Sequence, residues 1–417
     1  MTGFVRSGRR AEGGRAGDGS RLCLGLMAGT SLDGVDAALV RLSGPAARPR
    51  TELMQFFTVP YPTPLRERLL SAASGGAVNA GEISELNVRV GEIFARAALG
   101  VCRQAGVRPE RIAVVGSHGQ TVFHQGRAAR GARPSTLQIG SPAVIAETTG
   151  VPVVSDFRSA DIAAGGEGAP LVPMVDYLLL ADDRQGSVAL NVGGIANVTA
   201  VPAAARPEQV FGFDTGPGNI IIDALVRRFT RGRHRYDAGG RRAARGRVIE
   251  RVLEEALRFP FFRRRPPKSA GREEFGAEFV SRHFLASRFS PEDLLRTAVE
   301  LTVRSIAGAL ERFVFPRVGA AGKLRRLVIS GGGAHNRLLV ARLQALLPKL
   351  RIQLFDEYGW PVDAKEAMAF ALLADRTLHG LPGNLPAVTG AHRPAVLGTV
   401  TAGKISSRGS RDTTPSC

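Results

Sequence analysis

The chain has 417 residues, of which 44% are hydrophobic, and a formal net charge of +19 at pH 7. This length suffices for two domains of ordinary size, and the hydrophobic content suffices for a core in each. The best candidate for a membrane helix, 171–181, is interrupted by Asp176 and falls short of the roughly 18 apolar residues required. The first 20 residues contain no apolar signal-peptide segment. We therefore expect no membrane partner.

Cysteine usage indicates the compartment. The three cysteines are odd in number and widely spaced, at Cys23, Cys102 and Cys417. This pattern argues against a disulfide framework and predicts a cytoplasmic protein.

The positive charge is concentrated in one segment. Its members are Arg227, Arg228, Arg231, Arg233, Arg235, Arg241, Arg242, Arg245, Arg247, Arg251, Arg263, Arg264, Arg265, Lys268 and Arg272. Few aromatic residues are interleaved there for base stacking, and no nucleic-acid motif is present. We expect a solvated basic face and no specific nucleic-acid partner.

Hydrophobic patterning predicts a similar series of elements twice. The first series has strands at 21–27, 35–42 and 51–58, helices at 63–73 and 81–105, a strand at 111–115, a helix at 141–149 and a strand at 151–154. The second has strands at 187–192, 195–201 and 210–213, helices at 218–230, 248–258, 274–286 and 291–314, a strand at 326–330, and helices at 336–347 and 363–379. The repetition predicts a duplicated α/β unit, with two lobes that face one another across a cleft.

We expect the first lobe to cover 21–153, completed by a returning segment 393–404, and the second lobe to cover 154–392. Residues 1–20 are expected to form a disordered basic extension, and residues 405–417 a flexible tail.

A polar turn follows the first predicted strand, with the sequence Gly29-Thr30-Ser31-Leu32-Asp33-Gly34-Val35-Asp36. Its backbone N–H groups and hydroxyls suit anionic oxygens, and its two carboxylates suit a metal-bound phosphate. No Gly-Lys-Ser/Thr follows, so this is not a Walker loop. An ordinary hairpin with a polar turn is the alternative interpretation.

Three glycine-rich turns follow strands in the second half. They contain Asn191, Gly193 and Gly194; Asp214, Gly216, Gly218 and Asn219; and Gly331, Gly332, Gly333 and Asn336. Glycines let a backbone approach phosphates or a flat purine ring closely. A carboxylate at a strand end suits a general base, and amides at a helix N-terminus suit anions. A plain hairpin, a helix cap and tight helix–strand packing are the structural alternatives.

Further polar clusters are Gly116-Ser117-His118-Gly119-Gln120-Thr121, Asp156-Phe157-Arg158 with Asp161, and Gly165-Gly166-Glu167-Gly168. They suit sugar hydroxyls or a carboxylate, for which Arg158 is the natural partner. Glu366 lies in the first turn of the last helix, where it either favours the helix dipole or reaches a substrate hydroxyl.

Taken together, these motifs resemble the anhydro-N-acetylmuramic acid kinase family of the hexokinase/Hsp70/actin superfamily. The resemblance covers about residues 21–400 and is also carried by Pro267-Lys268-Ser269-Ala270-Gly271-Arg272-Glu273 and Glu366-Ala367-Met368-Ala369-Phe370. It implies an α/β protein with a two-lobed actin-like (ribonuclease H-like) ATPase fold, in which duplicated mixed-sheet domains flank a central cleft.

The resemblance also implies an activity. Members use ATP, Mg²⁺ and water to convert 1,6-anhydro-N-acetylmuramic acid into N-acetylmuramic acid 6-phosphate and ADP, in the cytoplasmic recycling of cell-wall sugar. It further implies a homodimer.

The implied site residues follow motif by motif. Asp214 would be the catalytic base, and Glu366, Thr121, Arg158 and Asn191 would bind the sugar. ATP would be bound by Gly29, Thr30, Ser31, Leu32, Asp33, Gly34, Val35, Asp36, Gly193, Gly194, Gly216, Gly218, Asn219, Gly331, Gly332, Gly333 and Asn336. Asp33 and Asp36 would hold the metal ion indirectly, through water.

The chain departs from the family pattern at three positions: Ala28 stands where Ser is usual, Glu167 where Gln is usual, and Ala270 where Thr is common. Two other functions remain alternatives. One is a kinase of the same superfamily that phosphorylates an ordinary sugar hydroxyl, and the other is an ATP-binding protein whose cleft motion serves a partner.

Overall fold

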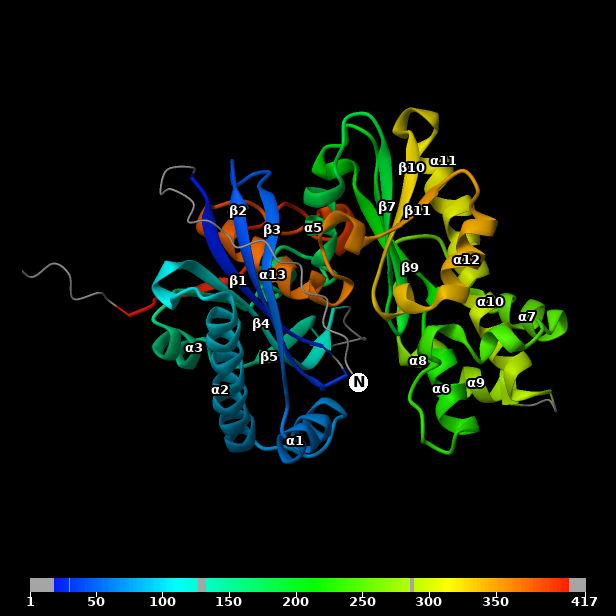
Figure 1. Ribbon diagram of the computed structural model, residues 1–417, viewed down its shortest axis with the longest axis horizontal. Coiled ribbons are helices and arrows are strands. Elements are labelled where there is room, and N and C mark those ends of the chain that lie inside the picture. The colour runs from blue at the N-terminus through cyan, green and yellow to red at the C-terminus, as the bar shows by residue number, and fades with distance from the viewer. Residues whose placement is uncertain (1–18, 30, 127–132, 286–288, 405–417) are drawn as a thin grey trace, which may run out of the picture.

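The computed structural model shows two α/β lobes, each built around a mixed sheet (Figure 1). It describes residues 19–29, 31–126, 133–285 and 289–404. Nearly all of the expected N-terminal extension, Thr30 of the first polar turn, and the expected tail 405–417 therefore lie outside the described residues.

The larger sheet contains the first three predicted strands in an antiparallel meander. Its strands are β1 (Arg21–Ala28), β2 (Gly34–Ser43), β3 (Arg50–Pro60), β4 (Ile112–Gln125), β5 (Ser135–Ile139), β6 (Val153–Ser155) and β12 (Thr399–Thr401). Their order is β12-β6-β4-β1-β2-β3, and β5 pairs with β4. β4 runs parallel to both β1 and β6.

The smaller sheet repeats this plan. Its strands are β7 (Gly186–Val192), β8 (Ile195–Val201), β9 (Phe211–Pro217), β10 (Leu324–Ser330) and β11 (Arg351–Leu354), in the order β11-β10-β7-β8-β9. β7, β8 and β9 form the meander, and β10 runs parallel to β7 and β11. The shared order and directions confirm the expected duplication and the two-lobed actin-like fold.

Helices cover both sheets. They are α1 (Thr63–Ala73), α2 (Ala80–Ala105), α3 (Pro142–Thr149), α4 (Ser159–Ala163), α5 (Val172–Leu180), α6 (Ile220–Phe229), α7 (Glu250–Leu257), α8 (Arg272–Phe275), α9 (Ala277–Val280), α10 (Pro291–Ala309), α11 (Phe315–Val318), α12 (Arg337–Leu346), α13 (Lys365–Leu378) and α14 (Pro386–Thr389). The predicted strand at 111–115 extends to Gln125, because β5, which was not predicted, pairs with its second half. The helix predicted at 274–286 is broken after Phe275, where Gly276 has an extended backbone.

The α13 helix packs against the larger sheet although it comes late in the chain; in Figure 1 it lies in orange beside the blue strands. Residues 367–374 are all buried, as expected for a helix that is apolar on every side. A Cβ at Gly25 of β1 would overlap the carbonyl oxygen of Ala367, and one at Gly116 of β4 would overlap that of Phe370. Glycine at both positions lets α13 lie directly on the sheet.

One buried cluster joins the lobes. It includes Val40 of β2, Val175 of α5, Val328 of β10 and Met368 of α13. The core between the sheets is therefore continuous, and α13 contributes to it from the side of the larger sheet. The boundaries 21–153 and 154–392, which put α13 in the second lobe, stay a prediction.

Candidate active site

One face of each sheet packs against the shared core. On this same face, polar side chains lie near the ends of the strands. In β2, Ala38 and Val40 belong to the core cluster, so Asp36 points the same way, because alternate strand residues share a face. Thr58 of β3 donates a hydrogen bond of 2.6 Å to Asp36 Oδ1. Burial raises the pKa of Asp36, although this bond opposes the rise. Asp36 therefore lies on the core-facing side of the larger sheet.

Four polar residues lie in register across the smaller sheet. Ser330 of β10 pairs with Asn191 of β7, Asn191 pairs with Asn197 of β8, and Asn197 pairs with Asp214 of β9. Paired residues point to the same face, so the four side chains form a row. Asn191 and Asp214 were predicted site residues, whereas Asn197 was not. The sequence signal for Asn197 was the Gly193-Gly194 turn, because this turn brings Asn191 and Asn197 opposite one another.

Asp214 is held by an adjacent segment. Its Oδ2 accepts a hydrogen bond of 2.8 Å from the Ala270 N–H, and its own N–H donates to the Lys268 carbonyl at 3.1 Å. Burial raises the pKa of Asp214 to about 6; the Ala270 bond and the Lys268 charge oppose the rise, and Glu167 and Glu273 add to it. A carboxyl group with this pKa is ionised at neutral pH and is poised to accept a proton.

Glu366 is surrounded by charged residues from distant parts of the chain. It is exposed, yet burial raises its pKa, so it lies deep in the protein and still reaches water, as a residue in a cleft does. The Asp36 charge raises this pKa further, whereas Arg158 and Lys365 lower it. The predicted sugar ligands Glu366 and Arg158, and Asp36 of the first turn, therefore lie close enough for their charges to interact.

Arg158 is anchored by a histidine to which sequence analysis gave no role. Its Nε and Nη2 lie 3.2 and 2.9 Å from His118 Nε2, and its Nη1 donates to the Gly168 carbonyl at 3.0 Å. Burial and the neighbouring guanidinium lower the pKa of His118 to about 3, and burial lowers that of Arg158 to about 10. The imidazole is therefore neutral and Arg158 keeps its charge at neutral pH.

Thr121 lies near the same end of β4. Its hydroxyl accepts a hydrogen bond of 3.2 Å from Gln138 of β5. The neighbouring Gln120 is fully buried and donates to the Gly29 carbonyl at 3.2 Å. Strand β4 therefore carries Thr121 and at the same time supports the start of the first polar turn.

The first polar turn is braced from outside. Arg66 of α1 donates a bond of 2.9 Å to the Leu32 carbonyl and forms an ion pair of 3.4 Å with Asp33. The Leu32 and Val35 side chains are buried in the core, which leaves only their backbone for a ligand. A Cβ at Gly34 would overlap the backbone of β3.

The turn between β7 and β8 caps helix α6. The Gly193 carbonyl accepts from the Asn219 N–H at 2.8 Å, and the Gly194 carbonyl accepts from the N–H groups of Gly218 and Ile220 at 2.8 and 3.0 Å. Sequence analysis proposed that amides at this helix N-terminus bind anions. The N–H groups of Gly218, Asn219 and Ile220 instead donate to carbonyl groups, so in this conformation they are not available to a phosphate.

Three glycines that were predicted to bind ATP are required for packing. Gly216 has φ +150°, and its Cβ would lie 2.7 Å from the Phe262 ring. Gly331 has φ +78°, and a Cβ there or at Gly333 would collide with Val192 of β7. At these positions the packing alternative explains the glycine.

Three of the other predicted ATP residues of the second lobe, Asn219, Gly332 and Asn336, line a pocket of about 490 Å³, whereas Gly193, Gly194 and Gly218 do not. Its walls are Asn219, Ile222, Asp223, Tyr236, Asp237, Ala238, Gly239, Gly332, His335 and Asn336. Gly332 is open on its pocket side, where the nearest atom to an added Cβ is Asn219 Nδ2 at 3.7 Å. Asn336 caps α12 by accepting from the Leu339 N–H at 3.1 Å. The size and the flat glycine wall suit a nucleoside.

Asp161, grouped with Arg158 in the sequence, is a structural anchor. It is fully buried, and its Oδ1 accepts from Asn384 at 2.6 Å and from Thr389 at 2.7 Å. Its Oδ2 accepts from the Gly168 N–H at 2.8 Å. The carboxylate is therefore used within the protein and does not face a ligand.

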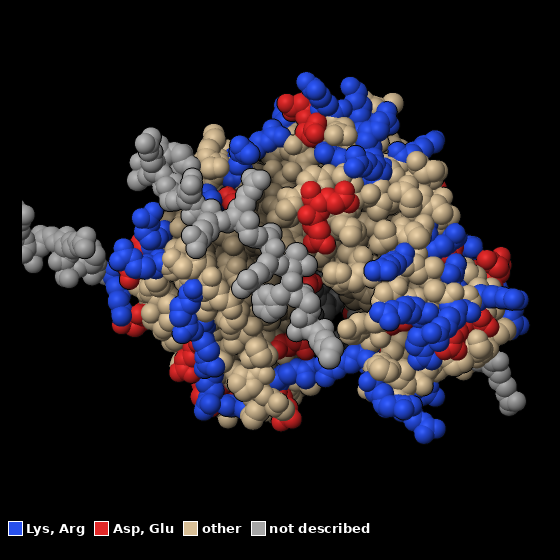
Figure 2. Space-filling model, in the orientation of Figure 1, with Lys and Arg blue, Asp and Glu red and all other residues tan. Residues whose placement is uncertain are grey.

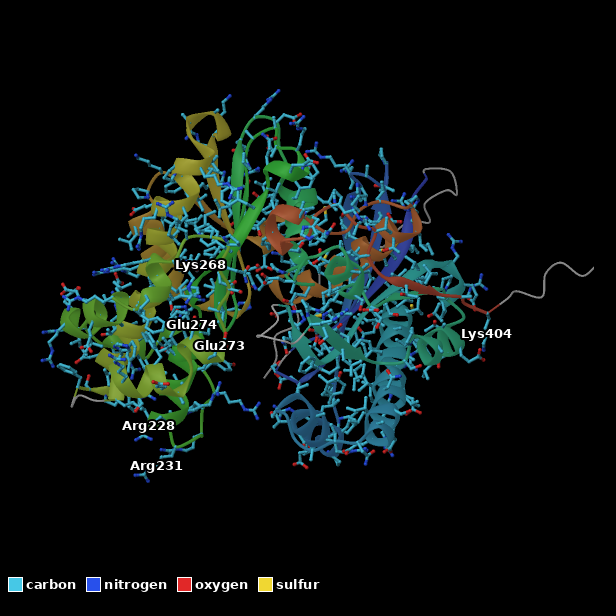
Figure 3. The ribbon with its side chains drawn as sticks, turned by 180° about the vertical axis from the view of Figure 1, so that it is seen from behind. Arg228, Arg231, Lys268, Glu273, Glu274 and Lys404 are labelled. Carbon is cyan, nitrogen blue, oxygen red and sulfur yellow. The ribbon has the colours of Figure 1, made fainter. Side chains whose placement is uncertain are left out.

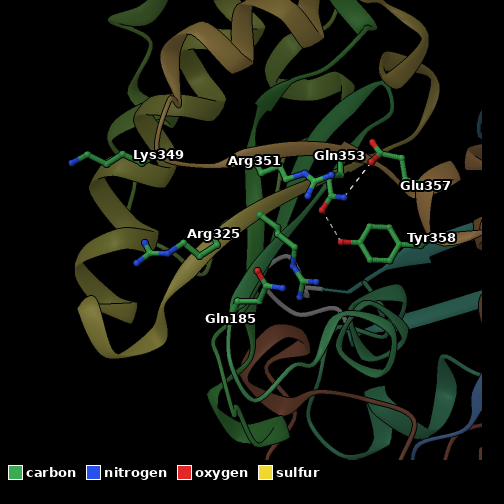
Figure 4. A pocket seen from close by; sticks show the side chains of 8 residues that line it. Gln185, Arg325, Lys349, Arg351, Gln353, Glu357 and Tyr358 are labelled. Carbon is green, nitrogen blue, oxygen red and sulfur yellow. Dashed lines mark hydrogen bonds between the residues drawn. The ribbon is translucent and has the colours of Figure 1, made fainter.

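A larger hollow of about 700 Å³ lies at the β10–β11 end of the smaller sheet (Figure 4). Its basic side chains do not converge, since Lys349 and Arg325 point away from Gln353 and Tyr358 in this view. Arg326 is already bonded to Ser187 at 2.9 Å. This arrangement does not form an anion site.

The basic segment is mostly solvated, as expected. Figure 2 shows Lys and Arg side chains gathered over the second lobe, in the region of α7 and α10. Arg228 and Arg231 are exposed and project from the fold (Figure 3). Among the members of this segment whose burial is described, Lys268 is the buried one.

Within the described part of the chain, no helix combines the length and the apolar character needed to cross a bilayer.

Comparisons with known proteins identify the family. The sequence profile described as "Anhydro-N-acetylmuramic acid kinase" matches residues 21–403. A protein of that name from Gloeobacter violaceus is 48% identical over 380 residues, which cover 91% of this chain and 98% of that protein. Proteins of the same name from Caldanaerobacter subterraneus subsp. tengcongensis and Bacillus thuringiensis subsp. konkukian are each 41% identical and cover 91% of this chain, with 96% and 98% of their own lengths. The chain therefore belongs to the anhydro-N-acetylmuramic acid kinase family.

Proposed function

We propose that this enzyme uses ATP and water to open 1,6-anhydro-N-acetylmuramic acid and to phosphorylate O6, giving N-acetylmuramic acid 6-phosphate and ADP. The observation that carries the proposal is the Asp214 carboxyl group. It ends the polar row of the smaller sheet, is oriented by the Ala270 N–H, and has its pKa raised to about 6. A base of this kind activates water near neutral pH.

In the proposed reaction, Asp214 takes a proton from a water molecule whose oxygen attacks C1 of the sugar. The bond between C1 and O6 breaks, and O6 attacks the γ-phosphorus of ATP. The bond between this phosphorus and the β–γ bridging oxygen breaks, and ADP leaves. Closure of the lobes excludes bulk water, which limits wasteful hydrolysis of ATP.

The sugar is proposed to lie between Asp214 and the neighbouring residues Glu366 and Arg158. Arg158, charged and anchored to His118, suits the lactyl carboxylate of the sugar. Glu366 suits a sugar hydroxyl, because its side chain is exposed. Thr121 and Asn191 are proposed to add hydrogen bonds from β4 and β7.

The nucleoside of ATP is proposed to occupy the pocket beside Gly332, with its phosphates directed toward the first polar turn. Thr30 of that turn lies outside the described residues. Mg²⁺ would neutralise charge on the β- and γ-phosphates. Among the described residues, no three His, Cys, Asp or Glu side chains are placed to hold a metal. Asp33 and Asp36 would therefore hold it through water, which fits two carboxylates engaged by Arg66 and Thr58.

Mass spectrometry tests this reaction. The protein is incubated with Mg²⁺-ATP and 1,6-anhydro-N-acetylmuramic acid in ¹⁸O-water. The expected product is a sugar phosphate with one solvent oxygen at C1 and an equimolar amount of ADP. A phosphorylated sugar without solvent oxygen would instead indicate a kinase acting on an ordinary hydroxyl, and would overturn the proposal. A role in recycling cell-wall sugar in the cytoplasm stays a prediction.

A further inference from the structure

Lys268 is buried in an aromatic cage. Its side chain is 4% exposed, and its ammonium lies 4.5 Å from the ring centroid of Phe261, 5.1 Å from that of Phe313 and 5.9 Å from that of Phe213. Its hydrogen bond goes to the Phe261 carbonyl, at 3.2 Å. In the described part of the chain, no ion pair joins this ammonium to a carboxylate. Figure 3 shows Lys268 within the second lobe.

The fold by itself does not call for a cation here. An ammonium group loses hydration on burial, and cation–π contacts with a carbonyl bond offset only part of that loss. An apolar side chain of similar length would fill the cage without this loss of hydration. Replacing buried ionic groups by well-packed apolar ones is often neutral or stabilising. The charge therefore points to a purpose other than folding.

The cage lies directly behind Asp214. Phe213, one of its walls, precedes Asp214 on β9. The backbone of the Lys268 segment binds Asp214 twice, through the Lys268 carbonyl and the Ala270 N–H, at 3.1 and 2.8 Å. Anchoring the Lys268 side chain thus fixes the N–H group that orients the Asp214 carboxylate.

We propose that Lys268 is a positioning residue that acts through Asp214: its ammonium locks the 268–270 segment against β9 and favours the ionised carboxylate that accepts the proton. This inference rests on the proposed role of Asp214 as the base.

The surrounding charges agree with this role. Lys268 lowers the pKa of Asp214, whereas Glu167 and Glu273 raise it. Burial, together with Arg312 and Arg264, lowers the pKa of Lys268 itself to about 8, and Asp214 opposes that change. Lys268 is the cation that offsets the two glutamates at Asp214.

The test compares Lys268→Met, which keeps the length and removes the charge, with Lys268→Arg, which keeps the charge. For Lys268→Met we expect the midpoint of urea unfolding to be at the wild-type urea concentration or higher, and the KM for ATP to stay within twofold of wild type. We expect kcat to be about tenfold lower, because part of the base's contribution, about 10²–10⁴ in rate, is lost. The acid limb of kcat/KM should move to higher pH. Lys268→Arg should keep the acid limb at its wild-type position.

Arg264→Gln is the matched control. Arg264 contacts the Phe261 ring from solvent, with 5.4 Å between its guanidinium carbon and the ring centroid, and pairs with Glu274 at 3.1 Å. Removing this charge should leave the acid limb unchanged.

A double variant that combines Lys268→Met with Asp214→Asn separates the two proposals. If Asp214→Asn keeps only a small residual rate and adding Lys268→Met lowers that rate no further, Lys268 acts through Asp214. Wild-type kcat and acid limb in Lys268→Met, with Asp214→Asn inactive, would overturn the role of Lys268 alone. A Lys268→Met protein that does not fold would also overturn it, because the charge would then serve the fold. Full turnover in Asp214→Asn would overturn both proposals.

Discussion

The neutral imidazole of His118 holds the guanidinium of Arg158. His118 Nδ1 lies 2.8 Å from the Gly119 carbonyl, which only accepts, so this nitrogen carries the proton. Nε2 is left as the acceptor for Arg158 at 2.9 Å. The pair shows how a residue on β4 orients a predicted sugar ligand on the β6–α4 connection.

The first prediction concerns this pair. His118→Leu removes the acceptor, so we expect the KM for the anhydro-sugar to rise about tenfold, with a smaller change in kcat, and the free energy of unfolding to fall by about 1–3 kcal/mol. Steady-state kinetics and urea unfolding measure both. His124→Gln is the control on the same strand, because His124 is exposed and bonded to Thr136. An unchanged KM in His118→Leu would contradict the role.

The second prediction concerns pH and the same histidine. The pKa of His118 is about 3 in the folded protein, below the ordinary value of 6.5, so the unfolded state binds the extra proton. Its contribution to stability is complete above pH 6.5 and is lost as the pH falls toward 3. Wild type should therefore lose more stability than His118→Gln between pH 7 and pH 4.5. Parallel curves in urea unfolding would exclude a neutral buried imidazole.

The third prediction concerns Asp214→Asn. We expect kcat to fall by about 10²–10⁴, because the base is lost. We also expect the protein to become more stable above pH 6. The folded pKa, about 6, exceeds the ordinary value of 3.8, so the ionised carboxylate costs folding free energy, about 3 kcal/mol.

This penalty grows from pH 3.8 to pH 6 and is constant above that, whereas below pH 3.8 wild type and Asp214→Asn should be equally stable. Urea unfolding at pH 3.5 and pH 8, with mass spectrometry of the product, tests both parts. In wild type, kcat/KM should rise with pH through about 6 as the carboxyl group ionises. A flat profile there would argue against Asp214 as the base.

The fourth prediction separates binding glycines from packing glycines. Gly332→Leu should fill the pocket and raise the KM for ATP at least tenfold, while the melting temperature stays near that of wild type, because a Cβ at Gly332 meets nothing closer than Asn219 Nδ2 at 3.7 Å. Gly333→Ala should lower stability by about 1–3 kcal/mol, because its Cβ overlaps Val192. Calorimetric titration with ADP and thermal unfolding distinguish the two. Equal ADP affinity in Gly332→Leu and wild type would place the nucleoside elsewhere.

The fifth prediction concerns a buried ion pair between α5 and α13, in the region where the lobes meet. The Lys365 ammonium lies 2.6 Å from Asp176 Oδ1, and both side chains are buried. Asp176→Leu leaves that ammonium without its carboxylate and should lower the free energy of unfolding by about 3–5 kcal/mol. The double variant Asp176→Leu, Lys365→Met should recover most of this loss. Additive losses in the double-mutant cycle would show that the two side chains do not interact.

Local sequence was sufficient for the elements that have strong patterns of their own. The two meanders, the long helices and the four glycine-rich turns were predicted, because alternation, helical periodicity and glycine clusters act over a few residues. The short strands β5 and β11 were missed, because 5 and 4 residues carry too little pattern of their own and each strand is defined by its pairing with β4 or β10.

Motifs identified the family and Asp214, but they did not say which members of a motif face a ligand. Gly331 and Gly332 are adjacent in one motif, yet one packs on β7 and the other opens to the pocket that is proposed to bind the nucleoside. That division depends on which neighbour approaches each Cα, and the neighbours come from distant elements.

By itself, the sequence determined the duplicated α/β plan and the chemical groups available to the site, because both are written in local patterns and residue types. Only the tertiary structure decided that His118 anchors Arg158, that Asn197 joins the polar row, and that Lys268 is buried behind Asp214. The physical reason is that hydrogen-bond partners and burial set pKa values and side-chain orientation, and these are supplied by segments that meet only when the two sheets and α13 pack together.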